Sequence, residues 1–291
     1  MMQCFHPINI RSPNYSGPVA CGNCFACQSN RRKDFAFRLK EEMKHSVCSY
    51  TLTLTYDNFN LPSLEEFLLD DPLNISSDEE PRKFYYHPYD IRDIQLFHKK
   101  LRKHFKLRYF GVAEYGSHSN RPHYHIIYFF KFAVDYNQFL QKVYSCWNKG
   151  SRITLDVTDD SCIEYTLKYC LKPQWIKQPP PKVFASKNPF IGQGFISESM
   201  LGYLERNRTG DFIKFPDYQK RLPRILRDYL YSGSDQMVEE NNFYLDNQVL
   251  QQQEQEFLDA EQRGLSYDEY VRLKQQTFTV QIIKSIKKKQ L

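Results

Sequence analysis

Strict alternation of apolar and polar residues over 49–56, SYTLTLTY, constrains the fold of this 291-residue sequence more than any other feature. Successive side chains of a β-strand point to opposite faces, so the pattern predicts a strand with one buried face. That face would carry Tyr50, Leu52, Leu54 and Tyr56. Similar runs at 108–115 and 122–130, joined by a loop at 116–121, predict two more strands, and 152–157 predicts a short fourth one.

Apolar residues at helical spacing predict helices at 29–45, 90–106, 135–147 and 160–171. Asp90 can cap the second of these, whose buried stripe would hold Ile94, Phe97, Leu101 and Phe105. Arg31, Arg32 and Lys33 fall in the first predicted turn of the first helix. Cations oppose the helix dipole there, so we expect them to serve a partner.

The pattern predicts three regions along the chain. Residues 1–172 would form the main domain, with an irregular Cys- and Pro-containing arm at 1–28 and an acidic loop inserted at 57–88. A Pro-rich connector at 173–196 would follow. Residues 197–291 would form a mostly helical region with a break near 210–216 and a Lys-rich basic tail.

Charge is unevenly distributed. The chain carries a net charge of +6, but 57–80 has eight carboxylates and no Lys or Arg, which leaves +14 on the remainder. A basic body indicates a polyanionic partner, nucleic acid first, although an ordinary charged surface gives the same balance. The acidic segment would either mimic DNA and shield a site or only decorate the surface.

No run approaches 18 apolar residues and the first 30 residues lack a signal-peptide core, so we expect neither a membrane span nor export.

Eight cysteines are present, and without an export signal we expect reduced thiols. Cys4, Cys21, Cys24 and Cys27 could together supply a tetrahedral structural zinc site. Simple buried thiols are the alternative, because a zinc ribbon usually has two separated C-x2-C pairs.

The run 122–130 places His123 and His125 on one strand face and Tyr124 on the other. If the preceding loop spans 116–121, Glu114 lies opposite His123 and shares its face. Two imidazoles and a carboxylate suit Mg²⁺ or Mn²⁺ when phosphate oxygens of a substrate complete the coordination shell, although imidazoles would accept softer metals too. A pair of polar residues on a half-exposed strand face would produce the same pattern.

The helix predicted at 160–171 has an apolar side with Ile163, Leu167, Cys170 and Leu171. The opposite side carries Tyr165, Lys168, Tyr169 and Lys172. Tyrosines four residues apart are neighbours on a helix, so they would present two phenols, flanked by ammonium groups, to an anion. Aromatic packing with solvated lysines is the alternative.

In combination and in this order, the histidine strand and the tyrosine helix resemble those of the HUH endonucleases. The chain is most similar to replication initiators of the Microviridae phages, especially the gokushovirus branch. The segments that carry this resemblance are VACGNCFACQSNRRKDFAFRL, YTLTLTYD, FGVAEYGSHSNRPHYHIIYF, EYTLKYCLK and RLPRILRDYL. It covers roughly residues 4–230 and implies an α+β fold, with a central antiparallel sheet of HUH type, flanking helices and the tyrosine helix over the metal face.

The resemblance implies a rolling-circle replication initiator. Such an enzyme nicks one DNA strand at an origin, keeps the 5′-phosphate on a tyrosine and leaves a 3′-OH primer, and a second attack circularises the released strand. Tyr165 and Tyr169 would be the nucleophiles, with Lys168 orienting or neutralising the phosphate. His123 and His125 match the family's ligands for Mg²⁺ or Mn²⁺, and Glu114 as a third ligand rests on the pairing argument above.

We expect single-stranded and origin DNA as partners. Candidate phosphate contacts are Arg31, Arg32, Lys33, Lys99, Lys100, Lys103, Arg121 and Lys172. No G-x-x-x-x-G-K-[ST] motif is present, so a host helicase would unwind the duplex and a host polymerase would extend the primer, in the host bacterial cytoplasm. An HUH relaxase or transposase would use the same site. A non-catalytic, zinc-containing single-stranded-DNA-binding protein is the alternative outside the enzymes.

Overall fold

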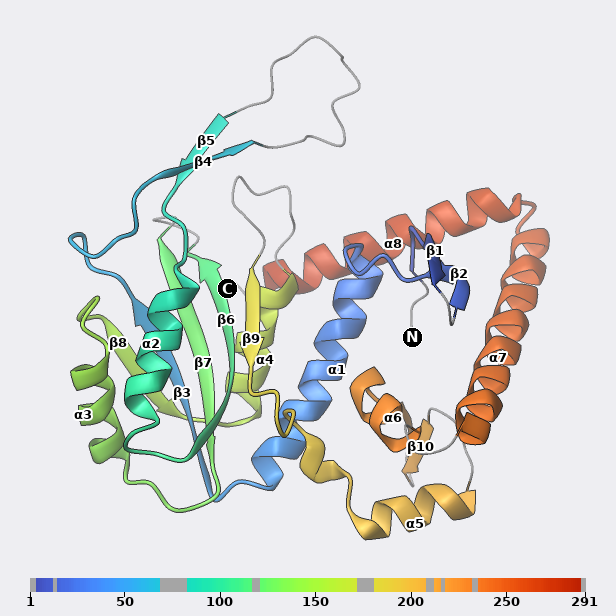
Figure 1. The fold of residues 1–291 in the computed structure, drawn as a ribbon. Coiled ribbons are helices and arrows are strands. Elements are labelled where there is room, and N and C mark those ends of the chain that lie inside the picture. The colour runs from blue at the N-terminus through green and yellow to red at the C-terminus, as the bar shows by residue number, and fades with distance from the viewer. Residues whose placement is uncertain are drawn as a thin grey trace. The chain divides into compact units, whose positions relative to one another are not determined.

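The computed structural model describes residues 4–12, 15–68, 83–116, 121–171, 181–207, 212–215, 218–231 and 235–288. The chain forms two compact units, one from Phe35–Phe195 and one from Met1–Asp34 together with Ile196–Leu291. Figure 1 traces the elements of both. The boundary near residue 34 falls inside the first helix, α1 (Phe25–Lys44).

The unit Phe35–Phe195 is built on a five-stranded sheet in the order β8-β3-β7-β6-β9, with every neighbouring pair antiparallel. Its strands are β3 (Cys48–Thr55), β6 (Leu107–Tyr115), β7 (Pro122–Phe130), β8 (Ile153–Val157) and β9 (Lys182–Ala185). Its helices after α1 are α2 (Ile91–Leu101), α3 (Tyr136–Cys146) and α4 (Asp160–Lys168), and a 3₁₀ turn, η1 (Tyr169–Leu171), extends α4. The predicted α+β class with a central antiparallel sheet is confirmed.

One face of this sheet, here called the packing face, carries the larger hydrophobic core, and α2 and α3 cover it (Figure 1). Asp90 and Asp135 cap these helices by accepting hydrogen bonds from the backbone N–H groups of Arg92 and Gln138. Alternation along β3 and β7 buries Tyr50, Leu52, Leu54, Tyr124, Ile126 and Tyr128 on this face. The stripe predicted for α2 packs against them, and each such side chain contributes about 1.5–3 kcal/mol by burial.

The opposite face, here called the site face, packs against α4 and the second half of α1. Its smaller core holds Leu39, Phe110, Val112, Ile127, Phe129, Ile163, Leu167 and Ile191. Thr53, His123 and His125 share this face with Ile127, because they alternate with the packing-face residues of the same strands. The aromatic core therefore lies on the packing face, whereas Thr53, His123 and His125 lie on the site face.

Two helix boundaries differ from those predicted. α1 begins at Phe25 and not at residue 29, so Arg31, Arg32 and Lys33 lie beyond its first turn. The prediction that these cations oppose the helix dipole was therefore wrong, because the effect fades after the first turn. α2 ends at Leu101 and not at residue 106, although Phe105 still packs against the core as predicted.

The acidic insertion was predicted as a loop over 57–88, but it contains a hairpin. β4 (Glu65–Leu68) pairs with β5 (Lys83–Tyr86) in antiparallel register. Four-residue strands are too short for alternation to stand out in the sequence. Most of the carboxylates fall in 69–82, which lies outside the described residues.

The predicted Pro-rich connector at 173–196 also contributes to the sheet. Its residues 181–196 are described, and β9 pairs with β6 there, at the edge of the sheet. The chain then passes through a 3₁₀ turn, η2 (Gln193–Phe195). Glu42 is 4% exposed, forms an ion pair with Arg108 and accepts a hydrogen bond from the Gly192 N–H at 2.7 Å. This polar cluster links the segment after β9 to α1 through Glu42 and to β6 through Arg108.

The described residues of the other unit form two hairpins, four helices and the start of α1. The hairpins are β1 (Ile8–Ser12) with β2 (Tyr15–Val19), and β10 (Phe212–Phe215) with β11 (Tyr218–Arg221). The helices are α5 (Glu198–Asn207), α6 (Arg224–Tyr231), α7 (Asp235–Gln262) and α8 (Tyr267–Lys288).

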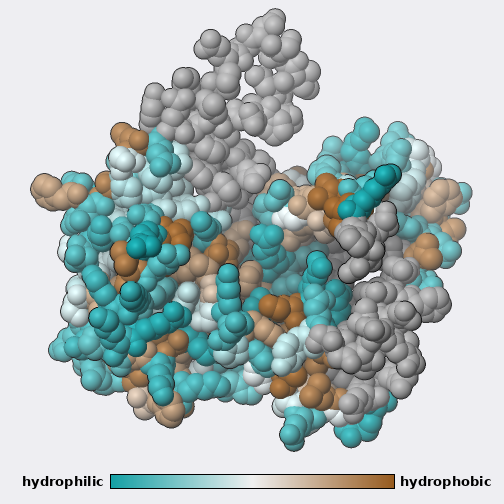
Figure 2. All heavy atoms as spheres, in the orientation of Figure 1, coloured by the Kyte–Doolittle hydropathy of each residue, from teal (hydrophilic) through white to brown (hydrophobic). Residues whose placement is uncertain are grey.

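The predicted helical C-terminal region is confirmed in this unit. The predicted irregular arm and the predicted break near 210–216 instead contain the hairpins. Gly17 and Pro18 weaken the strand pattern of β2, and the four-residue strands β10 and β11 are too short for a period to show. No helix among the described residues combines the length and apolarity needed to cross a bilayer. The visible surface in Figure 2 is largely hydrophilic, with hydrophobic residues in small scattered groups.

Candidate functional site

The register between β6 and β7 determines which polar side chains meet on the site face. Glu114 pairs with His123 and Tyr115 with Pro122, which confirms the predicted register. His125 lies two residues further along the same face, and its partner in β3 is Thr53. The sheet therefore brings Glu114, His123 and His125 to the same end of the site face.

Glu114 and His125 are the buried members of this group, with 3% and 6% exposure. His125 Nε2 lies 3.4 Å from Glu114 Oε1, and His125 Nδ1 lies 3.1 Å from Thr53 Oγ1. A buried carboxylate is costly unless a positive or hydrogen-bonding group compensates it. The imidazole of His125 is one such group, and a bound cation would be another.

His123 is half-buried, and its hydrogen bonding selects one tautomer. Its Nδ1 lies 2.7 Å from the carbonyl oxygen of Arg121, which can only accept, so Nδ1 carries a hydrogen. In the neutral ring, Nε2 then carries the lone pair that a metal ion requires. The His123 and His125 rings are nearly parallel, with centroids 6.5 Å apart.

α4 places the two predicted tyrosines beside these groups. Asp159 caps the helix by accepting a hydrogen bond from the Cys162 N–H at 2.8 Å. The fully buried side chains of Ile163 and Leu167 dock α4 on the site face. As a result, the Tyr169 ring stacks on His125 with centroids 4.3 Å apart, and Tyr165 meets the same imidazole edge-on at 5.9 Å.

The two tyrosines differ in their environment. Tyr165 is 52% exposed, whereas Tyr169 is half-buried and donates a hydrogen bond to the Tyr165 hydroxyl. Burial raises the pKa of the Tyr169 phenol well above its usual range, and the contact with Tyr165 raises it further. The prediction that both rings face away from the apolar side was wrong for Tyr169, which begins the tighter turn η1 and packs against the sheet.

Two predicted cations lie next to these side chains. Lys168 ends α4, and its Nζ is 5.9 Å from the centre of the Tyr165 ring. Arg121 contacts His123 through its carbonyl oxygen and donates from Nη2 to Asn58 Oδ1 at 2.6 Å. The structure therefore places Tyr165 and Tyr169 against His125 and Arg121 against His123, with Lys168 beside Tyr165.

The other predicted phosphate contacts belong to other segments of the chain. Lys99 and Lys100 belong to α2, and Lys103 follows it, so the sheet separates this helix from the tyrosines. Arg31, Arg32 and Lys33 belong to the Met1–Asp34 segment of the other unit. Lys172 lies outside the described residues.

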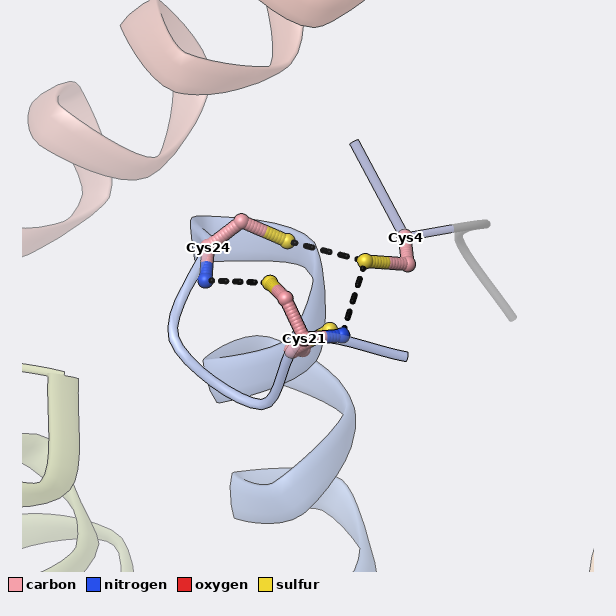
Figure 3. Close-up of side chains that lie close together, drawn as sticks. Cys4, Cys21 and Cys24 are labelled. Atoms are coloured by element: carbon pink, nitrogen blue, oxygen red, sulfur yellow. Dashed lines mark hydrogen bonds between the residues drawn. The ribbon is translucent and has the colours of Figure 1, made fainter. Parts of the chain in front are cut away.

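Four cysteines form a second candidate site in the other unit. The sulfur atoms of Cys4, Cys21, Cys24 and Cys27 all lie within 4.8 Å of one another. Cys21 and Cys24 lie at the turn into α1, and Cys4 faces them from a separate stretch of chain (Figure 3). The cluster could therefore bind a metal ion such as zinc.

Backbone N–H groups point at these sulfur atoms. The N–H groups of Cys21 and Cys24 lie 3.2 and 3.3 Å from the sulfurs of Cys4 and Cys21 (Figure 3). Burial raises the pKa of the Cys21 thiol, but hydrogen bonds from the N–H groups of Cys24 and Asn23 and from the Cys4 and Cys24 side chains outweigh burial and lower this pKa to about 7. Such donors favour the thiolate, which is the form that ligates a metal.

The two candidate sites differ in compactness. Within the described part of the chain, only the cysteine group has three or more His, Cys, Asp or Glu ligand atoms within 4.8 Å of one another. Glu114, His123 and His125 do not meet that spacing, although His125 and Glu114 are in contact. The nitrogen and oxygen donors form a looser group than the sulfur donors.

Two residues at the histidine group were not predicted. The sequence pattern identifies Thr53 only as part of the polar face of its strand, and it gives no signal for Asn58. Thr53 could have been found by pairing 49–56 with 122–130 in antiparallel register, since residues opposite each other share a face.

The strands and the tyrosine helix are similar to known replication-associated proteins. Residues 49–174 match the model of a family described as Replication-associated protein ORF2. The Replication-associated protein ORF2 of Spiroplasma virus 4 is 28% identical over 178 residues, covering 55% of this chain. The match includes 49% of that relative, so the chain spans about half of its length.

One solved structure was also matched, the hypothetical protein ORF119 from Sulfolobus islandicus rod-shaped virus 1. It has 18% sequence identity and a TM-score of 0.28, and the match covers 49% of this chain and 95% of that one. The family match over residues 49–174 includes Glu114, both histidines and both tyrosines.

Proposed function

We propose that this protein initiates rolling-circle replication of a small single-stranded DNA phage of the Microviridae type, acting as an HUH endonuclease and strand transferase. The similarity of residues 49–174 to replication-associated proteins supports a viral replication role. One observation carries the chemistry, which is the stacking of Tyr169 on His125 with Tyr165 beside it. A nucleophile and candidate metal ligands are thereby within reach of one phosphodiester.

The donor set suits a hard divalent cation. Glu114, His123 and His125 would hold Mg²⁺ or Mn²⁺, which would polarise the scissile phosphodiester. The buried Glu114 carboxylate and the Nε2 lone pair of His123 are the observations that fit such an ion.

The tyrosines would take turns as nucleophile. The oxygen of one phenol forms a bond to phosphorus as the bond to the 3′ oxygen breaks, the phenol proton leaves, and the 3′ oxygen gains a proton. Tyr165, the more exposed ring, can reach an incoming strand first. While one tyrosine holds the 5′-phosphate the other can attack the next junction, and Lys168 would neutralise the phosphate between them.

Adduct formation tests this proposal. Full-length protein is incubated with origin-derived single-stranded oligonucleotides and Mn²⁺ or Mg²⁺, and the product is resolved on a denaturing gel. We expect a covalent protein–DNA species, with mass spectrometry locating the nucleotide on Tyr165 or Tyr169. Absence of adduct on every origin-derived strand would reject the catalytic proposal and favour a single-stranded-DNA-binding protein.

A histidine variant tests the metal ligands separately. His123→Ala should abolish metal-dependent nicking while the protein stays folded, because His123 is half-buried and lies outside both cores. Circular dichroism controls for folding. Unchanged nicking would remove His123 from the metal site.

We further propose that Cys4, Cys21, Cys24 and Cys27 bind a structural zinc ion. Four sulfurs within 4.8 Å, with N–H donors aimed at them, support this role. Native mass spectrometry should find one zinc ion per chain, and Cys21→Ser with Cys24→Ser should lose it. The matched variant Cys48→Ser alters a cysteine outside the cluster and should keep the ion. A zinc-free wild-type chain would leave buried thiols as the explanation.

In a cell, the proposed nick would need other activities. A host helicase would separate the strands and a host polymerase would extend the 3′-OH, so the protein would act in the cytoplasm of a bacterial host. These partners follow from the proposed reaction, which supplies a primer end without unwinding or synthesis.

A further inference from the structure

Phe59 is the most exposed large hydrophobic side chain of the described residues, at 99%. It follows β3 at the end of the sheet where Glu114 and His123 lie. Single exposed hydrophobic residues are common on proteins, so exposure alone carries no function. Two further observations, the rigidity of its turn and the contacts of that turn, distinguish Phe59.

The turn that carries Phe59 is fixed by its own hydrogen bonds. Asp57 Oδ1 accepts from the N–H groups of Phe59 at 3.0 Å and Asn60 at 2.9 Å, and from the Asn60 side-chain amide at 2.9 Å. The Asp57 N–H donates to the Lys149 carbonyl at 2.9 Å, which ties the turn to the chain entering β8. The ring is therefore presented on a preorganised support, which lowers the entropic cost of binding.

The same turn is linked by contacts to the proposed active site. Asn58 Oδ1 accepts from Arg121 Nη2 at 2.6 Å, and the Arg121 carbonyl accepts from His123 Nδ1 at 2.7 Å. The Nε of Arg121 is buried and has no hydrogen-bond partner among the described residues. Phe59 therefore directly follows Asn58, which contacts Arg121, and Arg121 in turn contacts the candidate metal ligand His123.

We propose that Phe59 is a stacking platform for an unpaired base of single-stranded DNA, with Arg121 beside an adjoining phosphate. A nucleobase has two flat π faces, and an exposed ring on a fixed turn can stack on one of them without regard to sequence. The guanidinium supplies the charge that the neighbouring backbone requires. The inference rests on the proposed function, since it places the strand that Tyr165 and Tyr169 would cleave.

Binding measured without cleavage tests the inference. Fluorescein-labelled oligo-dT is titrated with full-length protein, without added divalent metal, and fluorescence anisotropy is followed. Phe59→Ala should weaken binding about 5- to 100-fold, the range found when a stacking aromatic is removed. Phe59→Trp should bind at least as tightly as wild type, whereas Phe59→Leu should resemble Phe59→Ala, since it is apolar but has no ring.

Phe132 supplies the matched control. It is 69% exposed and follows β7 at the opposite end of the sheet, beside the start of β3. Phe132→Ala should leave binding unchanged. Equal affinities for Phe59→Ala and wild type, or equal losses for Phe59→Ala and Phe132→Ala, would overturn the inference.

The outcome is separable from that of the proposed function. If wild type binds oligo-dT through Phe59 but forms no adduct on origin DNA, the stacking platform stands and the nuclease proposal fails. If adduct forms and Phe59→Ala binds normally, the nuclease proposal stands and the stacking platform is overturned. A wild-type chain that binds no single-stranded DNA overturns the platform.

Discussion

Two pairs of tyrosines lie on opposite faces of the same sheet and have opposite environments. On the packing face, the hydroxyls of Tyr56 and Tyr124 lie 2.8 Å apart, and both rings are less than 5% exposed. Tyr56 donates to Asp93 Oδ2, and the Tyr124 hydroxyl also lies 3.0 Å from the carbonyl oxygen of Asp90. On the site face, Tyr165 is half exposed and Tyr169 stacks on a histidine.

The contrast shows that a tyrosine pair alone does not define a reactive site. Burial raises the pKa of Tyr56, Tyr124 and Tyr169 above the usual range, so this property does not separate the pairs. Access does separate them, because a phosphodiester can reach Tyr165 but not a ring enclosed by α2 and Trp147. The core pair is expected to govern stability, and the site pair activity.

The largest expected effect is on activity. Tyr165→Phe combined with Tyr169→Phe should form no covalent adduct, since the oxygen that would attack phosphorus is gone. The urea midpoint should change little, because Tyr165 is half exposed. Adduct yield on denaturing gels is the measurement. Persisting adduct would mean that another residue is the nucleophile.

Tyr124→Phe should show the reverse behaviour. The lost hydroxyl contacts Tyr56 and the Asp90 carbonyl, so we expect the free energy of unfolding to fall by about 1–3 kcal/mol. Adduct yield should stay near wild type. Urea unfolding can be followed by the fluorescence of Trp147, whose ring centroid lies 5.9 Å from that of Tyr124. Strong loss of adduct in a folded Tyr124→Phe protein would contradict the assignment of stability to the core pair and activity to the site pair.

His98 should make the packing face sensitive to acid. It is 3% exposed with Nε2 2.9 Å from the Tyr128 hydroxyl, and burial together with the Arg102 charge lowers its pKa to about 3. Below pH 6.5 the imidazole therefore binds a proton in the unfolded chain but stays neutral in the folded protein. The free energy of unfolding then falls by up to about 1.4 kcal/mol per pH unit towards pH 3.

A variant isolates that contribution. Between pH 6.5 and pH 5, wild type should lose about 2 kcal/mol more stability than His98→Gln, as measured by urea unfolding at both pH values. Parallel losses in the two proteins would show that His98 is not kept neutral by the fold.

The smallest expected effect concerns Thr53. Its hydroxyl lies 3.1 Å from His125 Nδ1, so Thr53→Val should lower the rate of adduct formation about tenfold by leaving the imidazole without its orienting partner. Thr53→Ser keeps the hydroxyl and should restore the rate. Affinity for oligo-dT should be the same in all three proteins. If Thr53→Ser is as slow as Thr53→Val, the hydroxyl does not set the rate and the orienting role of Thr53 is rejected.

Local periodicity was enough to predict β3, β6, β7 and β8 and the convergence of Glu114, His123 and His125 on one face. Alternation in β3 and β7, together with the length of the 116–121 loop, predicts the register of Glu114 opposite His123 that the structure has. The apolar side of α4 likewise predicts docking through Ile163 and Leu167. These features can be predicted because each depends on residues that are close in sequence.

Features that depend on distant segments could not be predicted in the same way. The contact of Thr53 with His125 joins residues 72 positions apart, and that of Arg121 with Asn58 joins residues 63 positions apart. The short strands β4, β5 and β9 have too few residues for a period to show. The turn of Tyr169 towards His125 depends on the change from α to 3₁₀ geometry after Lys168, which the sequence does not signal.

The interleaving of Tyr124 between His123 and His125 has a consequence for sequence change. Deleting or inserting one residue within β7 would shift its side chains by one place. Tyr124 would then point to the site face, and the two histidines would point into the hydrophobic core of the packing face. Substitutions can be tolerated one at a time, but length changes in this strand would damage folding and chemistry together. Engineered insertions therefore belong in the turns at the strand ends, and a variant library built on β7 should hold its length constant.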